Sequence, residues 1–515
     1  MKITQPSARA AVEAVAIQNG ICVRPVPVRR YDLVTGQTKV IDIPCGSTLE
    51  TRCQSCAKRN RQLRMAQCRE GWHLDEEPVT TTAEPDWYQK YLIELRADAQ
   101  ARRDECESAG TSTEDYDGVI TELNTEIRQA GLRGDVLPDE KPRRTRSTRR
   151  RQDAPDLPKR KMAATTLGRV FEANGKTFRP SMFLTLTLPS YGRVRDGVPV
   201  DPDAYDYSRA ARDALHFSKL VDRFVQNLRR VAGYDVQYFS AVEPQRRLAP
   251  HLHMAIRGTL PRAEIKQIAA ATYHQVWWPS VDTIRFDGDH LPVWEDGAGY
   301  LDPTTGEILP TWDEALDAID EPLHVVRFGA QVDVKGVLSG TQDADQCVRY
   351  LGKYLTKNIG DCHTPQNEAQ RRHLDRFTDA LRYEPCSPIC PNWLRYGVQP
   401  KNAKPGMRPG GCRSKAHKPE HLGYAGRRVL VSRKWSGKTL TEHKRDRRAW
   451  VLEVLGLPGD QSAPDRYTWR PVKPGDDDVP SLTRRLLKQI SERQRWRAAM
   501  HDPPDDPPAT GQAAA

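Results

Sequence analysis

The apolar positions between residues 166 and 260 alternate in a way that predicts a sheet with helices packed on it. Residues 183–188 alternate bulky apolar side chains with threonine, which predicts a strand that ends before Pro189. A helix follows, because apolar residues recur there at helical spacing: Leu220, Phe224, Leu228 and Val231. Two more strands are predicted, over residues 236–242 and 251–258.

The same kind of pattern continues to residue 360. We predict a helix over residues 261–278, a polar and irregular insertion over 280–322, a strand over 324–334 and a helix over 343–359. Strands that follow one another closely favour antiparallel pairing. The order of elements therefore predicts an α+β domain over residues 165–360, in which helices flank a central, mostly antiparallel sheet of five-stranded type.

Weaker patterns lie on both sides of this domain. Residues 85–132 predict a helical segment with two apolar faces, formed by Trp87, Leu92 and Leu95 and by Val119, Leu123 and Ile127. Residues 136–162 are rich in Pro, Arg and Lys and predict a basic linker.

The C-terminal part of the chain is also divided by composition. Residues 361–450 predict a basic region with a strand over 428–432, and we expect this region to bind DNA. A basic amphipathic helix is predicted over 480–500 as part of a basic C-terminal extension, and a disordered tail over 501–515.

Charge narrows the function. The chain has 515 residues, a net charge of +11 and an isoelectric point near 9.1. An excess of clustered Lys and Arg favours a polyanionic partner, with nucleic acid first. No run of about 18 apolar residues is present, so a membrane span is not expected. The first residues lack the apolar core of a signal peptide, so a cytoplasmic location is expected.

Cysteines occur in two groups, and clustered Cys in a cytoplasmic protein favours metal binding over disulfides. Residues 1–80 predict a basic zinc-binding module in which four thiolates close a tetrahedral site: Cys45, Cys53, Cys56 and Cys68. Cys22 and His73 are alternative ligands. The second group predicts another zinc site: Cys386, Cys390, Cys412 and His417. Cys362, His363 and His421 are the alternatives there.

A pair of histidines on one predicted strand is the strongest catalytic candidate. His251 and His253 flank Leu252, and side chains two residues apart lie on the same face of a strand. Glu243 ends the preceding strand, so antiparallel pairing would bring its carboxylate beside both imidazoles. Two His and one carboxylate suit a divalent ion that must also hold a phosphate oxygen.

Two tyrosines follow on a predicted helix. Tyr350 and Tyr354 are four residues apart and share a helix face, and Lys353 and Lys357 repeat that spacing one residue back. A tyrosine that attacks a phosphodiester benefits from nearby positive charge, because its ordinary pKa is near 10.

The strand 183–187, the His-Leu-His of 251–253 and the Tyr-Leu-Gly-Lys-Tyr-Leu-Thr-Lys of 350–357 together resemble the three ordered motifs of rolling-circle replication initiators. These initiators belong to the His-hydrophobe-His (HUH) endonuclease superfamily, and the double tyrosine resembles its two-tyrosine branch. With the basic cysteine-rich N-terminus and the segment 423–440, the chain resembles the initiators of actinobacterial plasmids and integrative elements.

The resemblance implies a ferredoxin-like or RRM-like core with a zinc-ribbon-like N-terminal module. It implies that Mg²⁺ or Mn²⁺ is held by His251 and His253, with Glu243 as the third ligand by position. One tyrosine would attack origin DNA as a single strand, leaving a 5′-phosphotyrosine and a free 3′-OH primer, and the strands would later be rejoined. The apolar-x-x-Tyr-apolar-x-Lys pattern favours Tyr354 as the first nucleophile over Tyr350.

Other classes stay open at this point. Conjugative relaxases place the nucleophile before the histidines, whereas here the tyrosines follow them. Two-tyrosine transposases share this order, and a zinc-containing DNA-binding regulator without catalysis is the non-enzymatic alternative. Two partial phosphate-loop sequences lack the required first glycine, because Val170 and Ser432 stand at those positions. A host helicase and a host DNA polymerase are therefore expected partners.

Overall fold

The chain was analysed as a computed structural model, which divides into two compact units, Met1–Pro78 with Gln152–Ala515 and Val79–Arg151. The structure describes residues 6–72, 74–78, 85–132, 154, 156–338, 341–353, 355, 365–425, 428–454, 466–472, 476 and 479–501. Among these residues, no helix combines the length and the apolar character needed to cross a membrane.

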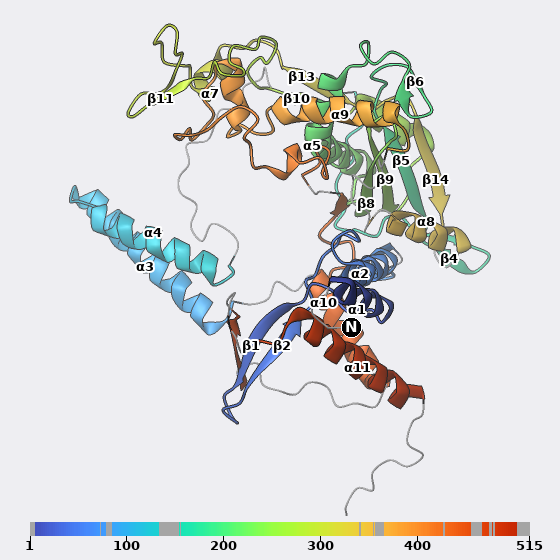
Figure 1. Ribbon diagram of the computed structural model, residues 1–515. Helices are drawn as coiled ribbons and strands as arrows, with labels where there is room; N and C mark the ends of the chain where they lie inside the picture. The colour runs from blue at the N-terminus through green and yellow to red at the C-terminus, as the bar shows by residue number, and fades with distance from the viewer. Residues whose placement is uncertain are drawn as a thin grey trace, which may run out of the picture. The chain divides into compact units, whose positions relative to one another are not determined.

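An antiparallel five-stranded sheet forms the centre of the larger unit, in the order β14-β5-β9-β8-β15 (Figure 1). Its strands are β5 (Ser181–Thr187), β8 (Tyr238–Pro244), β9 (Pro250–Arg257), β14 (Val332–Val337) and β15 (Val429–Val431). The predicted antiparallel α+β sheet is confirmed. Gly258 ends β9 with a φ of +78°, and a Cβ there would meet the Tyr234 hydroxyl, so this turn requires glycine.

The two faces of the sheet have different helical partners. Leu184, Leu186 and Leu252 point into a large core covered by α5 (Tyr207–Ala232) and α6 (Arg262–Ala271). Residues at the alternate positions, such as Phe239 and Ala255, pack instead with α2 (Gln54–Trp72) and α8 (Gln342–Lys353). The period of two along each strand thus assigns one face to the large core, and the other face to a smaller core and the candidate site.

Two predicted elements are corrected by the sheet pairing. The helix predicted over 261–278 ends at Ala271, and the chain continues as β10 (Tyr273–Val276). The strand predicted over 324–334 is two strands, since β13 (His324–Arg327) pairs with β10 and only β14 joins the central sheet. The aromatic and β-branched residues of β10 suit a paired strand, and this pairing overrides the helical spacing of the apolar residues.

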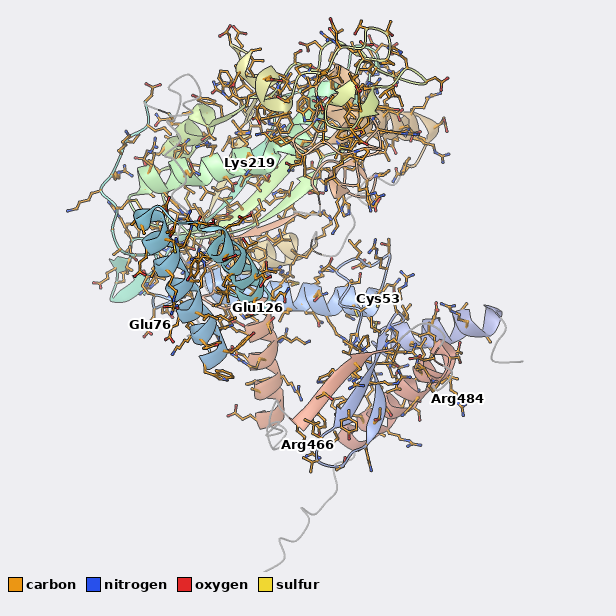
Figure 2. All side chains as sticks on the ribbon, turned by 90° about the vertical axis from the view of Figure 1, so that its left-hand side faces the viewer. Cys53, Glu76, Glu126, Lys219, Arg466 and Arg484 are labelled. Carbon is orange, nitrogen blue, oxygen red and sulfur yellow. The ribbon has the colours of Figure 1, made fainter. Side chains whose placement is uncertain are left out.

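The N-terminal and C-terminal segments share one small lobe. β1 (Val26–Asp32) lies between β2 (Thr38–Ile43) and β16 (Tyr467–Pro471), and α1 (Pro6–Gln18) packs with α11 (Leu482–His501). Arg466 pairs with Asp32 of β1 at 2.9 Å, and Figure 2 shows Arg466 and Arg484 on this lobe. The predicted amphipathic helix is therefore α11, and its Leu486 and Ile490 are buried with residues of the first cysteine module.

The remaining elements complete both units. The insertion over 280–322 contains short elements rather than only irregular chain. The remaining helices and strands of the larger unit are β3 (Phe171–Ala173), β4 (Lys176–Phe178), β6 (Val194–Arg195), β7 (Val198–Pro199), β11 (Val293–Glu295), β12 (Gly299–Leu301), α7 (Trp312–Asp317), α9 (Glu368–Tyr383), η3 (Pro391–Tyr396), η4 (Lys415–His417) and α10 (Leu440–Val454).

The smaller unit is a pair of helices, α3 (Trp87–Ala109) and α4 (Glu114–Gln129). Asp86 and Gln89 form a capping box at the start of α3. The buried contact residues are Leu92, Ala99, Ile120, Leu123 and Ile127. Trp87, Leu95 and Val119, which the spacing placed on the apolar faces, are exposed, because each helix buries a narrower stripe against its partner.

Candidate metal and tyrosine site

The central strand β9 carries both histidines of the candidate site. His251 and His253 lie on one face, while Leu252 between them is fully buried on the other. Antiparallel pairing with β8 puts Glu243 directly opposite His251. The strand register therefore brings together the three residues that the sequence selected.

The side chains of these three residues converge. Their ligand atoms lie within 4.8 Å of one another, and the Glu243 Oε2 atom is 3.6 Å from His253 Nε2. Burial, followed by the nearby His253, lowers the pKa of His251 to about 4, so His251 is neutral near pH 7. Two imidazoles and a carboxylate on one face are a donor set that fits a divalent cation with open coordination positions.

His253 is oriented by the neighbouring strand β5. The Thr185 hydroxyl lies 3.2 Å from His253 Nδ1, and Phe183 stacks on the imidazole with ring centroids 6.0 Å apart. A hydrogen bond at one ring nitrogen leaves the other nitrogen directed into the cluster. The sequence singled out this strand without assigning a role to either residue. The signal that could have identified them is that Phe183 and Thr185 are two residues apart on β5, and that Thr185 is the register partner of His253.

Tyr350 approaches this cluster from helix α8. Its hydroxyl lies 3.1 Å from His253 Nε2, and its ring stands edge-on to the imidazole at 4.7 Å. Buried Val348 and Leu351 hold the helix against the sheet. The exposed fraction of Tyr350 is 38%, so this residue is partly open to solvent.

The other predicted residues of this helix are only partly described. Lys353 is the last residue of α8 and is exposed. Tyr354 and Lys357 lie outside the described residues, so their predicted roles stay predictions.

The first cysteine cluster differs from the predicted set by one member. Cys45, Cys53 and Cys56 lie together with Cys22, and their sulfur atoms are within 4.8 Å of one another. Cys68 is elsewhere, buried beside Trp72 under α8, and burial raises the pKa of its thiol. A neutral thiol among apolar side chains is a packing residue. Cys22 therefore replaces Cys68 in a cluster that could bind zinc, while the alternative ligand His73 lies outside the described residues.

The second cluster contains all four predicted residues. Cys386, Cys390, Cys412 and His417 offer ligand atoms within 4.8 Å of one another, and this set could also bind zinc. The Sγ atom of Cys390 is 3.6 Å from the Nε2 atom of His417. The other ring nitrogen of His417, Nδ1, lies 2.7 Å from the carbonyl oxygen of Leu381. Cys362 and His363 lie outside the described residues, and His421 is not in the cluster.

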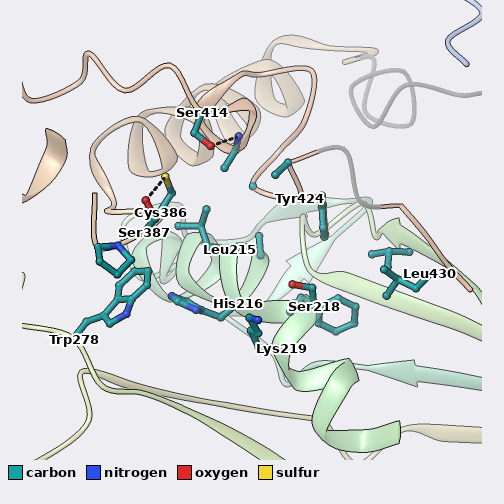
Figure 3. A pocket seen from close by; sticks show the side chains of 17 residues that line it. Leu215, His216, Ser218, Lys219, Trp278, Cys386, Ser387, Ser414, Tyr424 and Leu430 are labelled. Carbon is teal, nitrogen blue, oxygen red and sulfur yellow. Dashed lines mark hydrogen bonds between the residues drawn. The ribbon is translucent and has the colours of Figure 1, made fainter. Parts of the chain in front are cut away.

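A pocket of about 340 Å³ lies beside this second cluster. Cys386 and Trp278 line it on one side and Tyr424 on another, with Lys219 of α5 between them (Figure 3). The hydroxyl of Tyr424 is buried without a hydrogen-bond partner among the described residues. The pocket shows how the cysteine loop is packed onto α5, opposite the candidate site across the sheet.

An antiparallel core with a His-His-Glu cluster beside an exposed tyrosine is found here in a basic chain that carries two cysteine clusters. Comparison with known proteins assigns the chain to the replication initiators. It belongs to the family described as "Replication initiator protein, pSAM2" (RepSA), which matches residues 8–492.

A curated relative has a much shorter region of similarity. The "Replication initiator protein" of Streptomyces ambofaciens is 27% identical over 209 residues, which is 35% of this chain and 42% of the relative. The chain thus spans less than half of that relative's length. No solved structure matches the chain significantly. At the level of family, these findings favour a replication initiator over a transposase or a DNA-binding regulator.

Proposed function

We propose that this protein initiates rolling-circle replication by nicking one DNA strand at an origin and later rejoining it. The observation that carries the proposal is the 3.1 Å approach of the Tyr350 hydroxyl to His253 within the His-His-Glu cluster. A hydroxyl nucleophile beside a divalent-cation site is the arrangement that phosphodiester transesterification requires. Membership of the replication initiator family supports DNA as the substrate.

His251, His253 and Glu243 would hold Mg²⁺ or Mn²⁺. When bound, such an ion polarises the scissile phosphate and neutralises the charge that develops on its oxygens. Thr185 and Phe183 would keep His253 in position, since one bonds its Nδ1 and the other stacks on its ring.

The bond changes of the proposed reaction balance without a further reactant. The Tyr350 oxygen loses its proton and forms a bond to phosphorus, while the bond from phosphorus to the 3′ oxygen breaks. The 3′ oxygen gains a proton and becomes the primer terminus, and the phosphate stays on the protein as a 5′-phosphotyrosine. Because one phosphodiester replaces another, attack by a 3′-OH can rejoin the strand.

The proposal assigns the first attack to Tyr350, although the sequence pattern favoured Tyr354. The reason is that the structure describes a contact between Tyr350 and a candidate metal ligand. Tyr354 is proposed to accept the strand in the transfer that ends a round, and Lys353 and Lys357 to supply positive charge near the phosphate.

The assignment is tested with labelled single-stranded origin DNA and Mn²⁺. We expect a covalent protein–DNA adduct, and its rate of formation should fall by ~10³-fold or more in Tyr350→Phe, because the nucleophile is removed. Tyr31→Phe is the matched control, since Tyr31 is 40% exposed on β1, away from the cluster, and should leave the rate unchanged. Undiminished adduct in Tyr350→Phe, with loss in Tyr354→Phe, would assign the first attack to Tyr354. Adduct in the double variant would refute tyrosine chemistry.

The remaining components are proposed from the same family assignment. The two cysteine clusters are proposed to hold structural Zn²⁺. The two partial phosphate-loop sequences lack their first glycine, so strand separation and synthesis are proposed to depend on a host helicase and a host DNA polymerase.

A further inference from the structure

A cleft of about 640 Å³ lies between the two cysteine clusters. One wall is the loop that follows Cys45, together with Asn60 and Arg64 of α2. The opposite wall is the segment 415–421, which follows Cys412 in the second cluster. Residues that are hundreds of positions apart in the sequence therefore form one concave surface.

The walls of this cleft are strongly basic. Six cationic side chains line it against the single carboxylate of Glu420: Arg24, Arg52, Arg64, Lys415, Lys418 and Arg428. The combined effect of these cations is seen in the pKa of His421. Burial lowers the pKa of His421, and Lys415, Lys418 and Arg52 lower it further while Glu420 opposes them. Cations from both walls thus act on one point in the cleft, which is the field that attracts a polyanion.

Each wall is held by a different cysteine cluster. Asn60 Nδ2 donates to the carbonyls of Gly46 and Ser47, each at 3.0 Å, so the loop after Cys45 is fixed to α2. On the other side, Lys415 lies between the ligand candidates Cys412 and His417, within η4. Anchoring at both ends keeps these cations in place without DNA, which reduces the ordering required on binding.

The cleft lies near the candidate nicking site. Leu355 lines the cleft only five residues after Tyr350. Val429, another lining residue, pairs with Ala241 on β8, and Ala241 is in turn the register partner of His253. The cleft therefore lies within two strands of His253 and next to the chain segment that follows the tyrosine helix.

We propose that this cleft binds the phosphodiester backbone of single-stranded DNA next to the nicked position. The proposal rests on the proposed nicking function for its choice of DNA. The cleft's volume lies in the range of small-ligand pockets, about 300–1,000 Å³, which suits a short length of one strand. The His421 ring offers a surface on which a base can stack, and the cations contact phosphates without reading sequence.

The test is fluorescence anisotropy with a labelled oligothymidylate in EDTA-free buffer without divalent ions, using the Tyr350→Phe protein so that no cleavage occurs. Adding Lys415→Ala and Lys418→Ala should weaken binding about tenfold or more near physiological salt. The slope of log affinity against log salt should also fall by about 1.4, because each phosphate contact on a single strand contributes about 0.7. Arg24→Ala with Arg52→Ala should act in the same direction.

A matched pair of cations supplies the control. Arg262 and Lys266 are exposed on α6, on the opposite face of the sheet, and their double alanine variant should bind as tightly as the parent. Unchanged affinity and slope in both cleft variants would overturn the proposal, as would equal losses in the control. Zinc content must be retained in every variant. If Tyr350 did not nick DNA the binding result would still stand, and if the cleft did not bind DNA the adduct assay would be unaffected.

Discussion

At the scale of single residues, the first cysteine cluster shows how neighbouring sulfur atoms, rather than burial, distinguish a candidate metal ligand from a core thiol. The sulfur of Cys22 lies 3.8 Å from that of Cys53, in a group with Cys45 and Cys56. Cys68 is 1% exposed and packs with Trp72, Val348 and Leu351. Both are buried cysteines near the same helix, but only Cys22 has three sulfur neighbours among the described residues.

Substitution of Cys22 should therefore reduce the zinc content of the protein, whereas substitution of Cys68 should not. We expect Cys22→Ser to reduce zinc from about two ions per chain to about one, because a tetrahedral site loses a ligand. Cys68→Ser should keep its zinc but lower the free energy of unfolding by about 1–3 kcal/mol, because it buries a hydroxyl among apolar side chains. Elemental analysis and denaturant unfolding measure the two effects. Zinc loss in Cys68→Ser, with zinc retained in Cys22→Ser, would support Cys68 as the fourth ligand, as the sequence predicted.

At the scale of elements, α2 joins the N-terminal module to the central sheet. Trp72 at its end lies 6.5 Å from Trp435, whose indole nitrogen donates to the Cys68 carbonyl at 3.3 Å. Gly71 makes this approach possible, since a Cβ there would lie 2.2 Å from the Trp435 ring. Helix α8 packs in the same hydrophobic cluster as Trp72 and Trp435, so the docking of α2 also supports the helix that carries Tyr350.

Gly71→Ala should consequently destabilise the larger unit. Overpacking of a fully buried contact lowers the free energy of unfolding by about 1–3 kcal/mol. Gly118→Ala on α4 is the control, because nothing lies within 4 Å of its added Cβ and alanine favours a helix over glycine by about 0.8–1.0 kcal/mol. Thermal unfolding should show a lower melting temperature for the first variant and no decrease for the second. Equal melting temperatures would contradict close packing at Gly71.

At the scale of the whole molecule, a buried histidine on α5 and a half-buried histidine on β10 are expected to make the fold sensitive to acid. His216 packs edge-on to Trp278 at 4.5 Å and lies 5.8 Å from His274. Burial, together with nearby positive charge, lowers the pKa of His216 to about 3 and that of His274 to about 4. The native state therefore favours the neutral forms of both side chains.

The lowered pKa values of His216 and His274 set the direction in which stability changes with pH. Histidine in the unfolded chain has a pKa near 6.5, so below that pH the unfolded state binds more protons and the free energy of unfolding falls. At pH 5 the loss from His216 alone is about 2 kcal/mol relative to pH 7. His216→Phe should reduce the drop in melting temperature between pH 7 and pH 5, whereas His290→Phe, at an exposed position, should not. An identical drop in the His216 variant would exclude His216 as a source of acid sensitivity.

Local sequence was sufficient to predict most strands of the central sheet and the register that brings His251, His253 and Glu243 together. The alternation of residues 183–188 and the spacing of His251 and His253 depend on a period of two along a strand, which is a property of the backbone itself. The strand order also brought Glu243 opposite His251, as expected. These features required only neighbours in sequence or one antiparallel turn.

Only the tertiary structure decided the contacts between distant segments. It placed Cys22 in the first cysteine cluster, divided residues 324–334 between two sheets, and packed α11 with the N-terminal lobe. It also brought Tyr350 to His253 and formed a basic cleft from both cysteine loops. Such contacts are selected by burial and shape complementarity over the whole fold, so residue patterns within one segment carry little information about them.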